Sequence, residues 1–167
     1  KNKGLFPNHV VNKKGDVLER GILKVYKIYQ EKILALNACD FGDLILHCVS
    51  IFENKKDILN IYSNNFKYIL VDEYQDTNHV QYLIIKKLAA LNENICVVGD
   101  DAQSIYSFRG ASIQNILNFK VDYPDYKTFK LEQNYRSTSN IVNLANSLIT
   151  HNKKQIKKEV WTKNTSG

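Results

Sequence analysis

From Val17 onward, the apolar residues recur at intervals of three and four positions. They are Leu18, Ile22, Val25, Tyr29, Ile33 and Leu36. This spacing places them on one face of an α-helix, while charged residues such as Glu19 and Lys24 fall on the other faces. The pattern therefore predicts an amphipathic helical segment ahead of the rest of the chain.

A second helix is expected to begin after Asp40. Aspartate is a common N-cap, and Asp43 stands three residues later, where a capping box places its second polar residue. The stretch that follows carries the apolar residues Phe41, Leu44, Ile45, Cys48, Val49 and Phe52. We therefore expect Asp40 and Asp43 to fix the start of this helix.

The pattern then changes to short apolar runs, each ending in a polar cluster and followed by a helical stretch. The predicted strands are 66–71, 95–98 and 127–131, and the predicted helices are about 78–91, 112–119 and 138–150. Short runs of β-forming residues bounded by polar residues are typical of buried strands. Strands that alternate with helices over short connections predict an α/β fold, in which helices cover a parallel sheet.

Two adjacent carboxylates, Asp72 and Glu73, directly follow the first predicted strand. Proteins of the α/β class bind their ligands at the edge where parallel strands end. Such a pair can serve nucleotide hydrolysis, because one acid can hold Mg²⁺ while its neighbour orients the attacking water. The same acids could equally end the strand and cap the next helix, and this segment alone does not decide between the two interpretations.

Three motifs carry a resemblance to a known family. They are VDEYQD at 71–76, GDDAQSIYSFRGA at 99–111 and LEQNYRS at 131–137. In wording, order and spacing they resemble the Walker B, third and fourth motifs of the UvrD/Rep/PcrA family of superfamily 1 DNA helicases. The resemblance covers most of the chain from Asp40 onward. It implies a partial RecA-like P-loop NTPase motor domain preceded by a helical segment.

The resemblance also implies a division of the chain. Residues 1–38 would end an inserted helical subdomain, 39–150 would form the C-terminal part of the first motor domain, and 151–167 would start the second. The segment Asp40-Phe41-Gly42-Asp43-Leu44 is similar to the family's re-entry into its first motor domain, and 158–162 to its entry into the second.

For the nucleotide site, the resemblance implies ATP and Mg²⁺ as cofactors. Asp72 would bind the Mg²⁺, Glu73 would polarise the attacking water and Gln103 would sense the γ-phosphate. Tyr135 would stack on adenine, and Arg136 would contact the γ-phosphate. An ordinary loop glutamine is the alternative for Gln103, and Asp76 is interpreted as a helix cap rather than a nucleotide ligand.

Tyr106, Phe108 and Arg109 place two aromatic rings and a cation within four residues. This combination is typical of a platform on which single-stranded bases stack. The resemblance implies that Phe108 stacks on a base of the translocated strand. The alternative is that these aromatic residues pack in the core of a loop.

The net charge of +6 favours an acidic partner such as nucleic acid. The basic tail cluster of Lys153, Lys154, Lys157 and Lys158 is interpreted as a solvated face rather than a phosphate track. Arginine is rare, and Arg109 and Arg136, two of the three arginines, lie inside the motifs. A planar, multidentate cation suits phosphate clamping and base stacking.

Cys48 and Cys96 lie in apolar runs and are expected to be buried thiols, which fits a reducing, cytoplasmic compartment. The scattered histidines argue against a zinc site. No apolar stretch approaches the length of a membrane span, and no signal peptide is recognisable.

The sequence contains no G-x-x-x-x-G-K-[ST] phosphate loop and does not begin with methionine, so we expect an interior piece of a longer protein. The resemblance implies an ATP-dependent DNA helicase that moves 3′ to 5′ on single-stranded and partially duplex DNA, in repair or replication. The isolated chain is expected to be inactive. A non-catalytic nucleic-acid-binding or regulatory remnant is the alternative function. A helicase–nuclease subunit also stays open, as does the oligomeric state.

Overall fold

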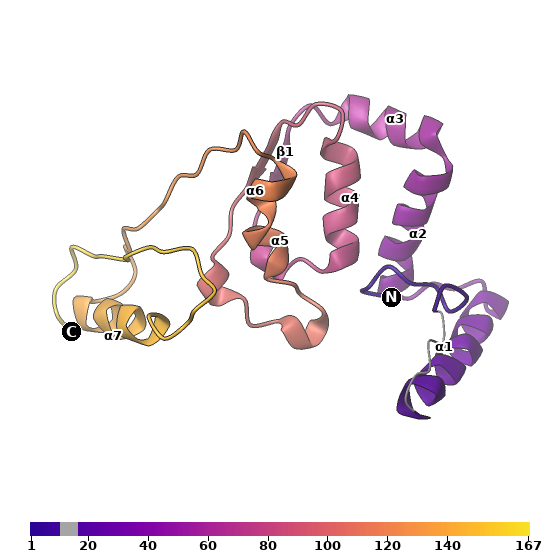
Figure 1. The fold of residues 1–167 in the computed structure, drawn as a ribbon, viewed down its shortest axis with the longest axis horizontal. Coiled ribbons are helices and arrows are strands. Elements are labelled where there is room, and N and C mark those ends of the chain that lie inside the picture. Colours follow the sequence, from indigo (N-terminus) through magenta and orange to yellow (C-terminus); the bar gives the residue numbers. More distant parts are fainter. Residues whose placement is uncertain (11–16) are drawn as a thin grey trace.

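The computed structural model describes residues 1–10 and 17–167 (Figure 1). The chain begins with helices α1 (Val17–Ala35), α2 (Phe41–Asn54) and α3 (Lys56–Asn65). The central part contains β1 (Ile69–Val71), the 3₁₀ turn η1 (Tyr74–Asp76), α4 (His79–Ala89) and β2 (Ile95–Val97). The turns η2 (Asp101–Gln103) and η3 (Ser107–Arg109) follow, and then helices α5 (Gln114–Leu117), α6 (Phe119–Asp122) and α7 (Ser139–Ile149). Figure 1 shows α1 and α7 near opposite ends of the molecule, with the strands and α4 between them.

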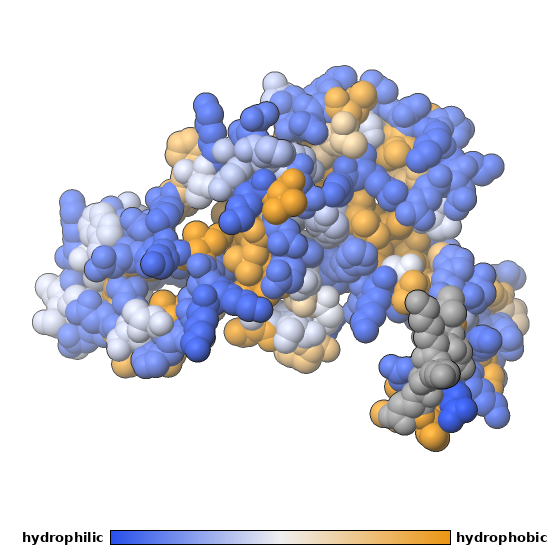
Figure 2. All heavy atoms as spheres, viewed as in Figure 1, coloured by the Kyte–Doolittle hydropathy of each residue, from blue (hydrophilic) through white to orange (hydrophobic). Residues whose placement is uncertain are grey.

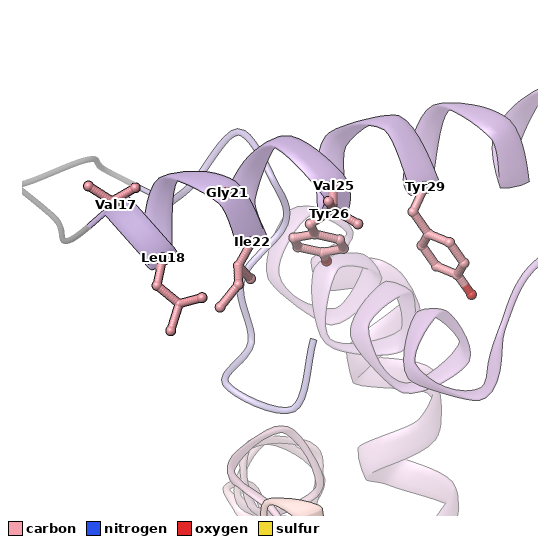
Figure 3. Close-up of a pocket in the computed structure, with 7 residues that line it drawn as sticks. All are labelled: Val17, Leu18, Gly21, Ile22, Val25, Tyr26 and Tyr29. Carbon is pink, nitrogen blue, oxygen red and sulfur yellow. The ribbon is translucent and has the colours of Figure 1, made fainter.

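The first predicted helix is confirmed as α1, but its apolar face is not covered. Leu18, Ile22 and Val25 are 68%, 60% and 67% exposed. Figure 3 shows Leu18, Ile22 and Tyr29 on the same side of α1, where they help to line a shallow hollow of about 640 Å³. Only residues of α1 line this hollow in the described part of the chain.

The predicted capping box is confirmed at the start of α2. The Asp43 N–H donates to Asp40 Oδ1 at 2.8 Å, and the Asp40 N–H donates to Asp43 Oδ2 at 3.2 Å. The Lys1 ammonium lies 2.5 Å from Asp40 Oδ2 and 2.9 Å from Asp43 Oδ2. Burial would raise the pKa of Asp40, but hydrogen bonds from Lys1, from the Asp43 backbone and from Tyr29 outweigh it and lower this pKa to about 2.

The core lies mainly between α2 and α4. The buried apolar residues are Leu46, Val49 and Phe52 of α2, Val80 and Ala89 of α4, together with Tyr74 and Val142. Removing these side chains from water is the main favourable contribution to folding. Figure 2 shows that hydrophobic residues also reach the surface in several places among the hydrophilic ones.

The helix after β1 begins where it was predicted, but its cap is Asn78 rather than Asp76. Asn78 Oδ1 accepts the Gln81 N–H at 3.0 Å, and Gln81 Oε1 accepts the Asn78 N–H at 2.9 Å. Asp76 lies within η1, two residues before the cap. The interpretation of Asp76 as the helix cap is therefore wrong.

The strands β1 and β2 pair in parallel as predicted, with Leu70 opposite Cys96 in the register. Both strands are shorter than expected, and the sheet has one open face. Successive side chains point to opposite faces of a strand, and on the face shared by Leu70 and Cys96, Leu70 is 78% exposed. Cys96 is also exposed, so the prediction of a buried thiol is wrong there. Cys48 is half-buried, and burial raises the pKa of its thiol.

The predicted third strand at 127–131 does not form. Figure 1 shows an extended connection between α6 and α7, and its side chains Phe129 and Leu131 are 83% and 88% exposed. A strand is held by a neighbour that pairs with its backbone N–H and C=O groups, and β1 and β2 pair only with each other within the described residues. The structure therefore contains a small two-stranded parallel sheet among helices, rather than a complete RecA-like sheet.

The helices that were predicted downstream of β2 are present with changed bounds. The single expected helix at 112–119 is divided into α5 and α6, while α7 agrees with the expected helix at 138–150. Among the helices in the described residues, none has both the length and the apolar character needed to cross a membrane.

Candidate functional site

The carboxyl ends of β1 and β2 are joined by backbone hydrogen bonds. The Val98 N–H donates to the Val71 C=O at 2.7 Å, and the Tyr74 N–H donates to the Val98 C=O at 3.0 Å. These bonds continue the parallel pairing beyond the strands. They hold the loop that carries Asp72 and Glu73 beside the loop that begins at Gly99.

The two adjacent acids are exposed at this edge of the sheet. Asp72 Oδ1 accepts the Glu73 N–H at 2.8 Å. The Glu73 backbone is left-handed, with φ 50° and ψ 41°, a conformation that costs a residue with a side chain about 1–3 kcal/mol. Strained residues of this kind cluster at functional sites.

Asp72 has the chemistry of a Mg²⁺ ligand. Mg²⁺ is commonly held by one or two carboxylates together with waters and substrate phosphates. Only one oxygen of Asp72 accepts a hydrogen bond among the described residues, and the side chain faces solvent at the end of β1. The remaining oxygen is therefore free to bind a cation.

Gln75 connects the two loops. Its side-chain Nε2 donates to Glu73 Oε2 at 2.8 Å, and its Oε1 accepts the Asp100 N–H at 3.0 Å. The residue is buried, with 1% of its surface exposed. Gly99 permits this approach, because a Cβ at that position would lie 2.6 Å from Gln75 Oε1 and 3.2 Å from the Tyr74 nitrogen.

Asp100 holds Gln103. Asp100 Oδ1 accepts the Ala102 N–H at 2.9 Å, and Asp100 Oδ2 accepts a hydrogen bond from Gln103 Nε2 at 2.9 Å. Burial would raise the pKa of Asp100, but hydrogen bonds from Lys158 and Gln103 outweigh it and hold this pKa below its usual value. The exposed amide of Gln103 is thereby fixed near the ends of both strands.

The segment after α7 returns to this loop. The Ile156 N–H donates to Oδ2 of the buried Asp101 at 2.7 Å, and the Lys158 ammonium forms an ion pair with Asp100. The interpretation of the lysine cluster as a solvated face is therefore wrong for Lys158. Lys153, Lys154 and Lys157 are exposed, in agreement with it.

The loop before α7 is held by the C-terminal segment. The Asn134 N–H donates to the Trp161 C=O at 2.7 Å, and the Trp161 N–H donates to the Glu132 C=O at 2.9 Å. Asn134 Oδ1 accepts the N–H of Arg136 at 2.8 Å and that of Ser137 at 2.7 Å. The backbone around Arg136 is therefore well supported.

Tyr135 and Arg136 are both exposed. The Tyr135 hydroxyl donates to Gln133 Oε1 at 2.9 Å, and no ion pair involves the Arg136 guanidinium within residues 1–10 and 17–167. No hydrogen bond in the described structure links Arg136 to Asp72 or Glu73. Because 127–131 does not form a strand, Arg136 does not follow the end of a strand of the sheet, and its place in the site stays a prediction.

Tyr106, Phe108 and Arg109 form a small exposed cluster at η3. The two ring centroids are 6.0 Å apart at 45°, and the Arg109 guanidinium lies 5.4 Å from the Tyr106 ring and 5.5 Å from the Phe108 ring. Phe108 is 77% exposed and Tyr106 is 39% exposed. The structure therefore does not support the alternative in which these aromatic residues are core packing.

A polar hollow of about 320 Å³ adjoins this cluster. Its lining residues are Asp76, Asn78, Gln81, Tyr106, Arg109 and Ala111. Asp76 Oδ1 is buried and has no hydrogen-bond partner among the described residues. The segment that carries Tyr106, Phe108 and Arg109 is followed by α5, and α5 is anchored to the residues just before α4. Asn115 Nδ2 of α5 donates at 3.0 Å to both the carbonyl oxygen and Oγ1 of Thr77.

Comparison with known proteins identifies the family. Residues 1–124 match the UvrD/REP helicase N-terminal domain, and residues 129–167 match the UvrD-like helicase C-terminal domain. The chain belongs to the UvrD/Rep helicase family. It is 48% identical over all 167 residues to an ATP-dependent DNA helicase PcrA from Staphylococcus epidermidis, and 47% identical over the same length to one from Staphylococcus aureus. It spans 23% of the length of each of these relatives.

The sequence analysis did not predict the residues that hold the two loops of the UvrD/Rep site together. Gln75, Asp100 and Lys158 each contact a loop that is distant along the chain. Gly99, directly after a strand, was the only local signal that two loops approach closely. Nothing in the sequence pattern indicated which side chains would meet there.

Proposed function

We propose that the chain is the interior part of an ATP-dependent DNA helicase motor that couples ATP hydrolysis to 3′-to-5′ movement on single-stranded DNA and to duplex unwinding. The observation that carries this proposal is the linkage of Glu73 and Gln103 through Gln75 and Asp100, at the carboxyl ends of parallel strands. Ligands of α/β proteins bind at that edge. The names of two relatives of similar sequence, both ATP-dependent DNA helicases, also support the proposal.

Each site residue has a proposed role in this motor. Asp72 binds Mg²⁺, Glu73 orients and polarises the attacking water, and Gln103 contacts the γ-phosphate. Tyr135 stacks on adenine, and Arg136 stabilises charge on the phosphoryl group. When bound, Mg-ATP supplies the transferred phosphoryl group and the metal neutralises its negative charge.

The DNA surface is proposed to be the exposed cluster of Tyr106, Phe108 and Arg109. An aromatic ring and a guanidinium beside it suit sequence-independent binding of single-stranded and partially duplex DNA. We assign 1–38 to the end of an inserted helical subdomain, 39–150 to the first motor domain and 151–167 to the start of the second. We further propose that the parent protein acts in DNA repair or replication in the cytoplasm.

A second candidate is a non-catalytic nucleic-acid-binding or regulatory remnant. It would bind nucleic acid through the exposed cluster of Tyr106, Phe108 and Arg109 and would hydrolyse no ATP. The two functions differ in what the longer protein contains. An encoding gene with a phosphate loop upstream supports the motor, whereas a gene that encodes only this segment supports the remnant.

The purified chain is expected to bind Mg-ATP weakly and to show no measurable turnover. A phosphate loop supplies the backbone N–H groups and the lysine that hold the β- and γ-phosphates, and this sequence has none. Phosphate release at steady state checks the prediction. Hydrolysis by the chain alone that Glu73→Gln abolishes would contradict it.

In the longer protein, Phe108→Ala is expected to weaken single-strand binding by about 1–3 kcal/mol, the size of one base-stacking contact. Phe108→Trp should be tolerated, because a base can stack on any aromatic ring. The salt dependence of binding should hardly change, since a stacking contact carries little charge. Titration of a labelled oligonucleotide at several salt concentrations measures both quantities.

Arg109→Ala serves as the electrostatic counterpart in the same titrations. It should lower the affinity and flatten the salt dependence if the guanidinium contacts a phosphate. Lys120→Ala, at an exposed cation on α6, is the control for loss of charge alone. If a folded Phe108→Ala protein binds DNA like the unmodified protein, the stacking platform is ruled out.

A further inference from the structure

Glu73 and Gln103 are connected by a continuous path of hydrogen bonds. Gln75 Nε2 donates to Glu73 Oε2 at 2.8 Å, and the Asp100 N–H donates to Gln75 Oε1 at 3.0 Å. Asp100 Oδ2 in turn accepts from Gln103 Nε2 at 2.9 Å. The path begins on the loop after β1 and ends on the loop after β2, so it crosses between the two strands.

Only a primary amide side chain suits the position of Gln75 in this path. One end must donate to a carboxylate while the other accepts a backbone N–H, and an amide does both without a charge. Because Gln75 is 1% exposed, water cannot readily replace either bond. A buried polar group without its partner would carry a desolvation penalty.

The surrounding residues restrict Gln75 to this arrangement. Gly99 leaves room for Gln75 Oε1, where any Cβ would come within 2.6 Å of that atom. The Ser104 hydroxyl reaches the Gln75 carbonyl oxygen at 3.4 Å from the other loop. Gln75 Nε2 also lies 3.4 Å from Asp76 Oδ2, so a negative charge placed there would face two carboxylates.

We propose that Gln75 is a positioning residue for ATP hydrolysis: it orients the Glu73 carboxylate and fixes it relative to the loop that carries Gln103. This inference rests on the function proposed above, because it assigns the orientation of Glu73 to a residue that touches neither nucleotide nor DNA. Gln75 thereby links the group that polarises the water to the group that contacts the γ-phosphate.

Two substitutions separate the two bonds of Gln75. Gln75→Leu removes both bonds, whereas Gln75→Glu keeps an acceptor for the Asp100 N–H and loses the donor to Glu73. The first measurement uses the 167-residue chain and follows hydrogen exchange of the Asp100 amide by NMR. Exchange should accelerate about fivefold in Gln75→Leu, the factor expected for one ordinary hydrogen bond. It should accelerate less in Gln75→Glu, which keeps the acceptor but places a carboxylate against Glu73 and Asp76.

The second measurement uses the longer protein and follows ATP hydrolysis. Both Gln75 variants should lower kcat by about 10²-fold, the usual effect of a displaced reacting group, and should leave the KM for ATP nearly unchanged. Gln114→Leu is the matched control, since Gln114 is exposed on α5 and its side chain makes no hydrogen bond within the described residues. A melting temperature for each variant shows that the protein is folded.

The outcomes distinguish a failure of the hydrogen-bonded path through Gln75 from a failure of the proposed function. Unchanged Asp100 exchange in a folded Gln75→Leu chain overturns the connection between the loops. An active longer protein in which folded Gln75→Leu and Gln75→Glu keep normal kcat overturns the positioning role. If the longer protein has no ATPase activity while the exchange of the Asp100 amide still depends on Gln75, the proposed function and the positioning role are both overturned. The hydrogen-bonded connection between the two loops would still stand.

Discussion

Arg136→Ala in the longer motor is expected to slow ATP hydrolysis by about 10³–10⁵-fold, the contribution of an arginine directed at a transferred phosphoryl group. In the proposed role, the guanidinium would stabilise negative charge that develops in the transition state, and a water molecule would not replace a fixed cation of this geometry. The backbone at Arg136 is held by Asn134 Oδ1 at 2.8 Å, while the side chain is exposed. A hydrogen-bonded backbone with an exposed guanidinium suits a residue that binds a ligand at the protein surface.

Arg136→Lys tests whether charge alone suffices. Lysine keeps the charge but loses the planar fork that binds two phosphate oxygens, so its rate should fall between that of Arg136→Ala and that of the unmodified protein. Arg20→Ala is the matched control, because Arg20 lies on an exposed part of α1 outside the three motifs. Single-turnover hydrolysis at saturating ATP measures the chemical step. A kcat for Arg136→Ala within tenfold of the unmodified protein would rule out the proposed role.

Features set by neighbouring residues in the sequence were predicted well. The capping box of Asp40 and Asp43 depends on two side chains three positions apart, and it marks the start of α2 as expected. The amphipathic spacing after Val17 predicted α1, and the short apolar run at 95–98 predicted β2. A helix start or a strand end is decided by local chemistry, which a single sequence displays.

Features that need distant partners were predicted poorly. The run 127–131 has the composition of a strand, but a strand also needs a neighbour, and β1 and β2 pair with each other alone in the described residues. The prediction that Cys96 is buried was wrong for the same reason, because composition does not show whether a sheet face is covered. In the case of Lys158, an expected solvated charge instead meets Asp100, 58 positions earlier in the sequence.

The same difference between local features and features that need distant partners holds for the candidate site. The motifs that carry Asp72, Glu73 and Gln103 could be found from strand ends followed by polar residues. Gln75 lies inside the first of these motifs, but its connecting role could not be predicted, because that role depends on the distance between two loops and on its burial. A motif shows which residues stand together in the sequence, whereas the contacts between two loops are seen only in the structure.

Asp43→Ala is expected to lower the free energy of unfolding of the chain by about 3 kcal/mol, the size of the loss when one partner of a buried ion pair is removed. Asp43 is fully buried, and its carboxylate accepts from Gln30 Nε2 at 3.0 Å and lies 2.9 Å from the Lys1 ammonium. The substitution would leave Gln30 without its partner, since Gln30 Oε1 already lacks one among the described residues. It would also remove one half of the capping box at Asp40. Urea denaturation followed by far-UV circular dichroism measures the change.

Two further variants show which interaction matters. Asp57→Ala removes an exposed acid from the first turn of α3, and should cost no more than about 0.3–1 kcal/mol, the effect of a charge near a helix N-terminus. Asp43→Asn keeps the shape and a hydrogen-bond acceptor but removes the charge, so it should fall between the two alanine variants. If Asp43→Ala costs no more than Asp57→Ala, the buried acid acts only as an ordinary helix-terminal charge. A cost near 3 kcal/mol means instead that Asp43 joins Lys1, α1 and α2 into one cooperative unit.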